Sequence, residues 1–104
     1  MSIFTKRLKE ARRELNLSQE ALGILAGIDE DSASARMNQY EKGKHEPDFT
    51  MVERIAKALN VPESYLYAKD EQAASLLKQL HRMTPSARKK LIELIQQNIL
   101  SEKE

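Results

Sequence analysis

The sequence has no cysteine and no tryptophan, and its 104 residues include only three glycines and three prolines. Without cysteine, disulfide bonds and thiolate metal sites are excluded. Aromatic residues make up 5% of the chain, so a core must consist mainly of aliphatic side chains, which suits helix packing. So few glycines and prolines cannot supply the many tight turns of an all-β fold. These scarcities favour one small helical protein.

Long hydrophobic runs are also missing. The longest mainly apolar stretch, residues 21–28, is far shorter than a membrane span. The first 15 residues are charged throughout and lack the apolar segment of a secretory signal. Together with the absence of cysteine, this pattern favours a cytoplasmic location.

The net charge is only +1, but its distribution is uneven. Residues 1–17 carry five basic and two acidic side chains, whereas residues 18–41 carry one basic and five acidic ones. Nucleic-acid binding needs positive charge near the phosphates. In this chain that charge must come from the first segment and from Arg36, Lys42 and Lys44.

Apolar residues recur at spacings of three and four along most of the chain, which predicts helices. Phe4, Leu8, Ala11 and Leu15 form the first such stripe. The predicted helices span residues 3–15, 18–26, 32–42, 49–59, a short segment from 62, 71–82 and 85–100, with a frayed tail at 101–104. The side chains expected to face the core from the second and third helices are Ala21, Leu22, Leu25, Ala26, Ala33, Met37 and Tyr40.

The stretch from Leu17 to Pro47 has the outline of a helix-turn-helix. Ser18 can cap a first helix, Gly27 can adopt the left-handed conformation that ends it, and Gly43 can end a second helix. A helix-turn-helix places its second helix in the major groove of DNA. The pattern therefore predicts a DNA-binding element.

Over residues 8–66 the chain resembles the Cro/CI-type (XRE-like) helix-turn-helix repressors of phages and bacteria. The matching segments are LKEARRELNLSQEALGILAGI, MNQYEKGKHEP and VERIAKALNVPESYL. The resemblance implies an all-α fold, with a five-helix lambda-repressor-like DNA-binding domain and two additional C-terminal helices. We expect the helix-turn-helix domain over residues 1–69 and a C-terminal extension, for packing or dimerisation, over 70–104.

The resemblance further implies a sequence-specific transcriptional regulator, a repressor, that binds double-stranded DNA as a homodimer. The expected DNA-binding residues are Gln19, Ser34, Ala35, Arg36, Asn38, Gln39, Lys42 and Lys44. Gln19 and Lys44 are expected at phosphates, and Arg12 and Glu41 correspond to a structural ion pair between the first and third helices. Independently of the resemblance, glutamine and arginine can form bidentate contacts with adenine and guanine, respectively.

One departure from the family pattern lies between Ile28 and Glu41. This part of the chain is longer than usual by about one helical turn, and the extra residues include the acidic run Asp29–Asp31. Either the turn is enlarged or the third helix starts earlier. Acidic side chains here suit the start of a helix, and they should lie away from phosphates or contact base amino groups.

Residues 71–100 contain two apolar stripes that are too hydrophobic to remain exposed. They can fold back onto the first five helices, or they can form a dimer interface. We expect the last helix to contribute to such an interface through Leu91, Leu94, Ile95 and Ile99. Residues 71–100 are also a possible site for another protein partner.

Two other functions remain open from the sequence. An antitoxin could combine the same DNA-binding domain with toxin binding through the C-terminal helices. A protein-interaction module could keep the fold without DNA binding, which the acidic run and the near-zero net charge favour. An enzyme has no support, because the chain lacks a nucleophile elbow and a phosphate loop, and His45 and His81 are too few for a metal site. We therefore expect no cofactor and no metal.

Overall fold

The computed structural model describes residues 2–103, and all regular structure in this range is helical. The elements are α1 (Ile3–Glu14), α2 (Gln19–Leu25), α3 (Glu30–Glu41), α4 (Phe49–Leu59), the 3-10 helix η1 (Glu63–Tyr67), α5 (Glu71–Arg82) and α6 (Pro85–Lys103). The all-α prediction is therefore confirmed. Within residues 2–103, no helix combines the length and apolar content needed to span a membrane.

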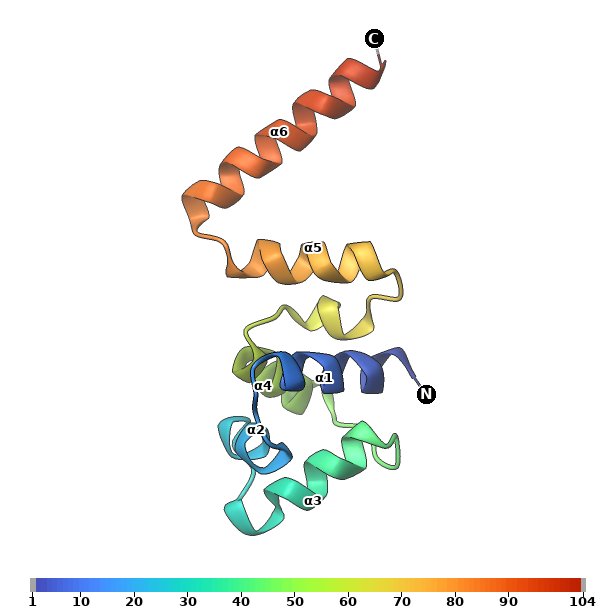
Figure 1. Cartoon of the computed structure of the whole chain (residues 1–104), viewed down its shortest axis with the longest axis vertical. Coiled ribbons are helices and arrows are strands. Elements are labelled where there is room, and N and C mark those ends of the chain that lie inside the picture. The colour runs from blue at the N-terminus through green and yellow to red at the C-terminus, as the bar shows by residue number, and fades with distance from the viewer. Residues whose placement is uncertain (1, 104) are drawn as a thin grey trace.

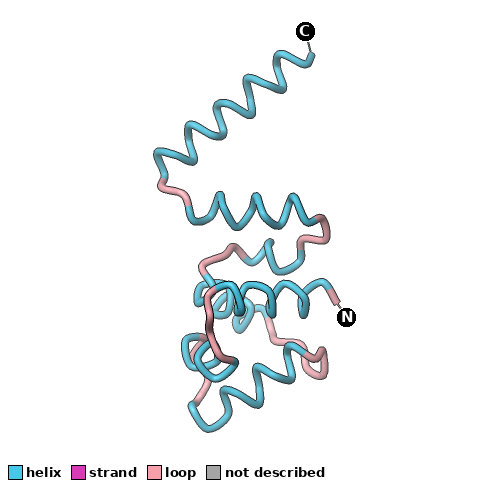
Figure 2. Tube along the Cα trace, in the orientation of Figure 1, coloured by secondary structure: helices cyan, strands magenta, loops and turns pink. Residues whose placement is uncertain are grey.

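The helices form a compact body with one projecting arm. In Figure 1, α3 lies at one end of the body, α1 and α4 lie in the middle, and α5 closes the other end. A short loop follows α5, and α6 then projects away from the body. Figure 2 shows this loop in pink and α6 as a single helix beyond it. The molecule therefore measures 58 Å along its longest axis but only 28 and 23 Å across. We call residues 3–82 the body and α6 the arm.

Side-chain caps begin most of the helices at the residues that the sequence predicts. The hydroxyl of Ser18 accepts a hydrogen bond from the third residue after it, and Ser2, Asp48 and Asp70 do the same for their own helices. Each cap satisfies one of the free N–H groups at a helix start. Asn60 ends α4 in the left-handed conformation, with φ at 55°. Local sequence therefore determines these boundaries.

The core of the body lies between α1, α2, α3, α4 and η1. Its largest fully buried apolar side chains include Leu8, Leu22, Met37, Ile55 and Leu66, each from a different element. Since each of these five elements contributes one of these side chains to the same cluster, the five elements pack around a single centre. This centre holds α2 and α3 in fixed positions relative to α1 and α4.

The prediction that Leu25 faces the core is wrong. Leu25 is 60% exposed, whereas Gly23 on the same helix is buried against α3. The close approach of α3 at Gly23 turns α2 so that Leu22 and Ala26 face the core and Leu25 faces solvent. The spacing of apolar residues along the helix was compatible with a buried Leu25. Packing against α3, however, buries a narrower face of α2 that does not include Leu25.

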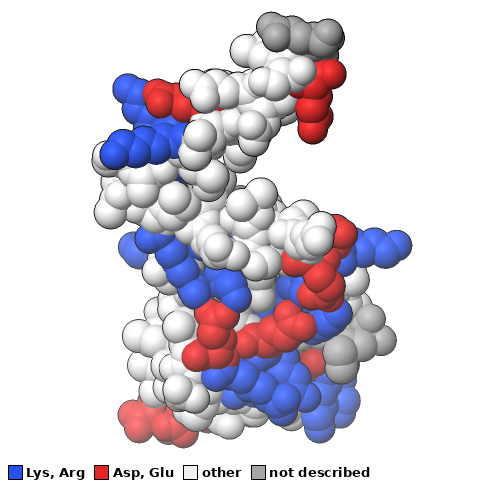
Figure 3. All heavy atoms as spheres, turned by 45° about the horizontal axis from the view of Figure 1, so that its top comes forward, with Lys and Arg blue, Asp and Glu red and all other residues white. Residues whose placement is uncertain are grey.

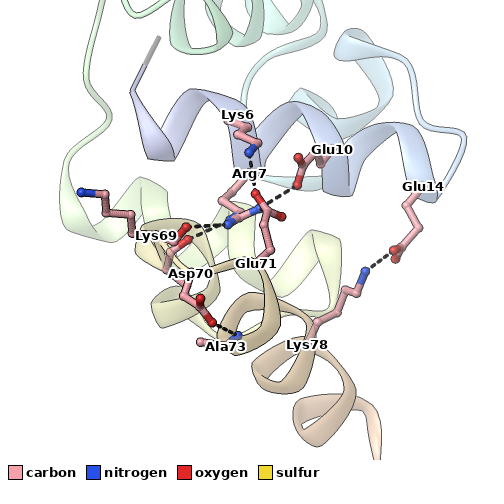
Figure 4. A network of polar contacts seen from close by, with 10 residues as sticks. Lys6, Arg7, Glu10, Glu14, Lys69, Asp70, Glu71, Ala73 and Lys78 are labelled. Carbon is pink, nitrogen blue, oxygen red and sulfur yellow. Dashed lines mark hydrogen bonds and ion pairs between the residues drawn. The ribbon is translucent and has the colours of Figure 1, made fainter.

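A buried arginine joins α5 to α1. The Arg7 side chain is only 1% exposed, and its guanidinium donates to the carbonyls of Ala68 and Lys69 and to the carboxylates of Glu10 and Glu71. Figure 4 shows Arg7 at the centre of this network. Hydrogen bonds to the carboxylates raise the pKa of Arg7, so its charge is permanent. Nothing in the sequence distinguished Arg7 from the exposed basic residues of α1.

A second link ties the far end of α1 to α5. The Glu14 carboxylate pairs with Lys78 and with Arg82, and these hydrogen bonds lower the pKa of Glu14. Arg82 also donates to the carbonyls of Leu59 and Asn60, at 3.1 and 3.0 Å. The first half of the C-terminal extension therefore packs against the helix-turn-helix half of the molecule.

The arm does not fold back. No residue from 85 to 102 is buried, and five of its large apolar side chains are 41–62% exposed: Ile92, Leu94, Ile95, Ile99 and Leu100. The helix continues to Lys103, so the predicted frayed tail from Ser101 is also wrong. The two C-terminal helices therefore differ. α5 folds back onto the rest of the body, whereas α6 remains uncovered.

Candidate nucleic-acid interface

A glycine allows α2 and α3 to pack at close range. A Cβ built on Gly23 would lie 2.8 Å from both the Cβ and the carbonyl oxygen of Ala33, so only glycine fits here. Gly27, with φ at 88°, then turns the chain. The Ile28 N–H donates to the Gly23 carbonyl at 2.9 Å, and the Ile28 side chain is buried. The α2–turn–α3 unit is therefore closely packed.

α3 begins at Glu30, two residues before the predicted start at Ser32. Asp29 occupies the N-cap position, and its carbonyl accepts a hydrogen bond from the Ser32 N–H at 2.9 Å. Glu30 and Asp31 thus occupy the first turn, where negative charge is favoured by the helix dipole. The extra residues lengthen α3 and leave the turn short.

The outer face of α3 carries most of the residues predicted to read bases. Ser34, Ala35 and Arg36 are exposed, and Asn38 and Gln39 are half-buried. The opposite face is buried through the predicted residues Ala33, Met37 and Tyr40. One face of α3 is thus committed to the core and the other is available to a partner.

Two predicted phosphate-binding lysines follow directly after this face. Lys42 is the C-cap of α3, Gly43 takes a positive φ of 73°, and the Lys44 N–H donates to the Gln39 carbonyl at 2.9 Å. Both lysines are exposed. The turn therefore places their two ammonium groups beside the end of the helix.

Arg36 contacts an aromatic ring instead of a carboxylate. Its Nη2 donates to the hydroxyl of Tyr40 at 2.9 Å, and its guanidinium carbon lies 5.9 Å from the centre of the Tyr40 ring. Neither Asp31 nor Glu41, the acidic residues closest to it along α3, forms an ion pair with Arg36. The contact restrains the side chain while most of its donors remain available.

A polar network connects the start of α2 to α3 and α1. The amide nitrogen of Gln19 donates to Asn38 Oδ1 and to Glu41 Oε1, both at 3.2 Å. Glu41 also forms a two-point ion pair with Arg12, at 2.5 and 3.0 Å, and Arg12 donates to the Leu17 carbonyl. The predicted residues Gln19, Asn38, Arg12 and Glu41 thus lie together, away from Arg36.

A groove beside α3 includes one basic residue that sequence reasoning missed, Arg54. The groove has a volume of about 500 Å³, and its lining carries both signs of charge, with Arg36 and Arg54 on one side of the balance and Glu46 and Asp48 on the other. Arg54 lies on the exposed face of α4, and the polar side of that amphipathic helix was the only signal for it.

Within the described residues, no three His, Asp or Glu side chains gather as a metal site requires.

Comparisons with known proteins agree with this geometry. Residues 5–71 match the family model described as a helix-turn-helix domain, which is well over half of the chain. The chain belongs to the helix-turn-helix domain family. Among solved structures, one match is titled the crystal structure of transcriptional regulator BswR, with 43% sequence identity and a TM-score of 0.82. That match covers 93% of this chain and 94% of the other.

The similarity to the BswR structure extends over almost the whole chain, including the C-terminal helices outside the family match. A comparison with curated protein sequences found no match. The helix-turn-helix family and the all-helical fold are therefore both established, in agreement with the resemblance in the sequence.

In this helix-turn-helix, the lengthened α3 brings an acidic side chain onto the outer face. Asp31 lies four residues before Ala35 and is exposed, so the two are neighbours on one side of the helix. The sequence-based set of contact residues did not include Asp31, because α3 was expected to begin after it. The outer face of the second helix is thus acidic at its start and basic at its end.

Proposed function

We propose that the chain is a sequence-specific DNA-binding transcriptional regulator that represses by covering a promoter, with α3 in the major groove. The observation that carries the proposal is the two-sided character of α3, which is buried on one face and open on the other. Membership of the helix-turn-helix family supports it, as does the similarity to a structure titled as a transcriptional regulator. An α-helix of this kind fits the width of the major groove.

Arg36 and Gln39 read bases in this proposal. Arginine can donate two hydrogen bonds to guanine, and glutamine can form a bidentate pair with adenine. The small side chains of Ser34 and Ala35 allow the helix to approach the groove floor and thymine methyl groups closely. Each good bidentate contact contributes about 1–3 kcal/mol of discrimination between bases.

Lys42, Lys44 and Gln19 hold the DNA backbone. The two lysines pair with phosphates, which anchors the protein without reading sequence. Gln19 lies in the first turn of α2, where free backbone N–H groups can also bind a phosphate. Its bonds to Asn38 and Glu41 hold its side chain in place before DNA arrives.

Asp31 has a separate role in this proposal. A carboxylate repels phosphates, but it can accept a hydrogen bond from the amino group of cytosine. Because Asp31 stands at the start of α3, it would reject backbone contacts there and favour a cytosine edge. The acidic start of the helix thus contributes to specificity and lowers non-specific affinity.

The proposed regulator is a homodimer joined through α6. Ile92, Ile95 and Ile99 follow one another at spacings of three and four, and all three are exposed. Figure 3 shows a broad uncharged area along the arm. A helix of 19 residues is about 28 Å long, so two arms can bury an extended apolar seam.

Charges at the ends of this seam favour an antiparallel pair. Arg88 precedes Ile95 by seven residues and Glu102 follows it by seven, so all three share one face. In an antiparallel pair centred on Ile95, Arg88 of each protomer meets Glu102 of the other, whereas a parallel pair opposes like charges. Arg88 uses Nε and Nη2 on the carbonyls that end α5, which leaves Nη1 for a partner.

The DNA proposal is tested by selecting bound duplexes from a random-sequence pool at two salt concentrations. We expect a short palindromic site, because two protomers related by a two-fold axis read two half-sites. Affinity should fall steeply as salt rises. Failure to enrich any site, together with salt-independent binding, would refute DNA recognition and leave the protein-interaction module as the better function.

Variants separate the proposed readers from the anchors. Arg36→Ala and Gln39→Ala should each relax base preference at one position, whereas Lys44→Ala should weaken all sequences alike. Lys90→Ala, an exposed lysine on the arm, is the matched control and should leave half-site preference unchanged. Equal losses for all four variants would contradict the division of roles.

Sedimentation of the full chain tests the dimer. Ile95→Asp should give a monomer, since a charge on the seam must be buried on association. Glu102→Lys should weaken an antiparallel dimer but leave a parallel one nearly unchanged, because a parallel pair opposes like charges before and after the change. A dimer that tolerates Ile95→Asp would place the interface elsewhere.

A further inference from the structure

A second groove adjoins the predicted DNA-binding face and shares Lys42 and Lys44 with it. It has a volume of about 780 Å³ and is formed by the start of α1, the loop that follows α3 and the end of η1. The loop comes close to α1, since a Cβ on Gly43 would lie 3.7 Å from the Thr5 methyl group. The volume is in the range of small-molecule sites.

An aromatic pair, the half-buried Phe4 and the exposed Tyr67, lines one side of this groove. The rings of Phe4 and Tyr67 lie 5.6 Å apart and are tilted by 33°, and Tyr67 remains 56% exposed. An aromatic ring placed beside such a pair gains offset or edge-to-face contacts in addition to apolar burial. The groove therefore favours a flat, aromatic ligand.

Three lysines, Lys9, Lys42 and Lys44, line the same groove. None of them forms an ion pair with another described residue, whereas Lys6 and Lys78 are both paired with carboxylates. Two carboxylates also line the groove, and one of them, Glu41, is already bound by Arg12. Positive charge is thus in excess beside the aromatic pair, which favours an anion.

We propose that this groove binds a small aromatic carboxylic acid. The ring of the acid packs against Phe4 and Tyr67, and its carboxylate pairs with the lysines. Because Lys42 and Lys44 are also the proposed phosphate anchors, the bound acid displaces DNA and acts as an inducer. This second step rests on the proposed function, but binding of the acid does not.

Binding is measured on the full chain without DNA, by following backbone amide signals in NMR spectra. The probe is 2-naphthoate, and 2-naphthamide is its uncharged match. We expect 2-naphthoate to shift the amides of residues 42–46 and of the first turn of α1, and 2-naphthamide to bind several-fold more weakly. No shifts at millimolar 2-naphthoate, or shifts confined to α6, would overturn the proposal.

Two substitutions test the assigned contacts. Lys9→Gln should weaken 2-naphthoate binding by about two- to fivefold, as expected for one exposed ion pair, and leave 2-naphthamide binding unchanged. Tyr67→Ala should weaken both probes by about two- to tenfold. Lys90→Gln on the arm is the control. If Lys9→Gln weakens both probes equally, no lysine–carboxylate pair is made at Lys9 and the charge assignment is wrong.

Competition with DNA tests the inducer role. We expect 2-naphthoate to release a 20-base-pair duplex at low salt, with a smaller effect for Tyr67→Ala. If the acid shifts the groove amides and DNA stays bound, the inducer role is refuted. If the protein binds no DNA while the groove shifts persist, the DNA function fails and the groove assignment stands.

Discussion

The body and the arm treat their apolar side chains in opposite ways. Every large side chain in the centre of the body, such as Leu8, Leu22 and Ile55, is fully buried by neighbours from the same chain. In the arm, Ile92, Ile95 and the other large apolar residues remain largely exposed. The comparison shows that apolar side chains on a helix become buried only where other elements of the chain cover them. The core of the body is covered by its own chain, and the apolar surface of the arm is left uncovered.

The sharpest contrast is between one isoleucine in the body and one in the arm. Ile55→Ala should lower the free energy of unfolding by about 2–5 kcal/mol, because it removes a fully buried side chain and leaves a cavity. Ile99→Ala should change it by about 0.5 kcal/mol or less in a dilute sample. Urea denaturation followed by circular dichroism measures both. Equal losses would mean that the arm is covered by its own chain.

The next effect concerns the contact between α2 and α3. Gly23→Ala should destabilise the body by about 1–3 kcal/mol, since the added methyl group meets Ala33 at 2.8 Å. Thermal unfolding should show a lower midpoint, and DNA affinity should fall because α3 moves relative to α2. Ala73→Gly, at an exposed site on α5, is a control for a change of one methyl group. An unchanged midpoint for Gly23→Ala would show that α3 can yield at this point.

A smaller, pH-dependent effect arises where α5 joins the body. Hydrogen bonds from Arg7 and Lys6 lower the pKa of Glu71 from 4.5 to about 2. A carboxyl group with a lowered pKa contributes stability above pH 4.5 and loses it as the pH falls toward 2. Glu71→Gln should therefore reduce stability near neutral pH and make little difference in strong acid.

The measurement is the urea midpoint of the wild type and of Glu71→Gln at several pH values. The difference between the two should shrink as the pH falls through the acidic range. Glu53→Gln, which alters an exposed carboxylate on α4, serves as the control and should show no such trend. A difference that stays constant down to strong acid would exclude the ion pair as its origin.

The smallest expected effect concerns the arm in isolation. Leu94→Ala should leave the unfolding of the body within about 0.5 kcal/mol of the wild type, because Leu94 is 58% exposed. If two arms pair through Ile92, Ile95 and Ile99, the same change should leave the dimer dissociation constant nearly unchanged, because Leu94 is rotated by about 100° from Ile95 around the helix axis. Sedimentation over a range of concentrations separates the two readouts. A large loss of body stability would show that the arm packs on the body in solution.

Much of the fold was predictable because its signals are local. Ser18 caps α2, Gly27 follows the end of α2 and Asn60 ends α4, and each depends on backbone groups within a few residues. The apolar stripe of α4 likewise follows from helical spacing. The exposed face of α3, with Ser34 and Arg36, was also predictable once the helix was placed.

Other features required distant residues to meet. Arg7 looks like any basic residue of α1 until the carbonyls of Ala68 and Lys69 surround it. Gly23, and not Leu25, faces α3 because Ala33 lies against it. Periodicity cannot reveal these contacts, since it reports the faces of a single helix and not the partner that each face meets.

The sequence by itself thus determined the helices, their caps, the helix-turn-helix and its family, because short-range hydrogen bonds and apolar spacing encode them. Tertiary structure decided that the extra residues extend α3, that Asp31 joins its outer face, and that α5 packs on η1 and is joined to α1 by ion pairs while α6 stands apart. The physical reason is that burial and ion pairing depend on residues more than 60 positions apart, such as Arg7 and Glu71. Such contacts exist only once the chain has folded.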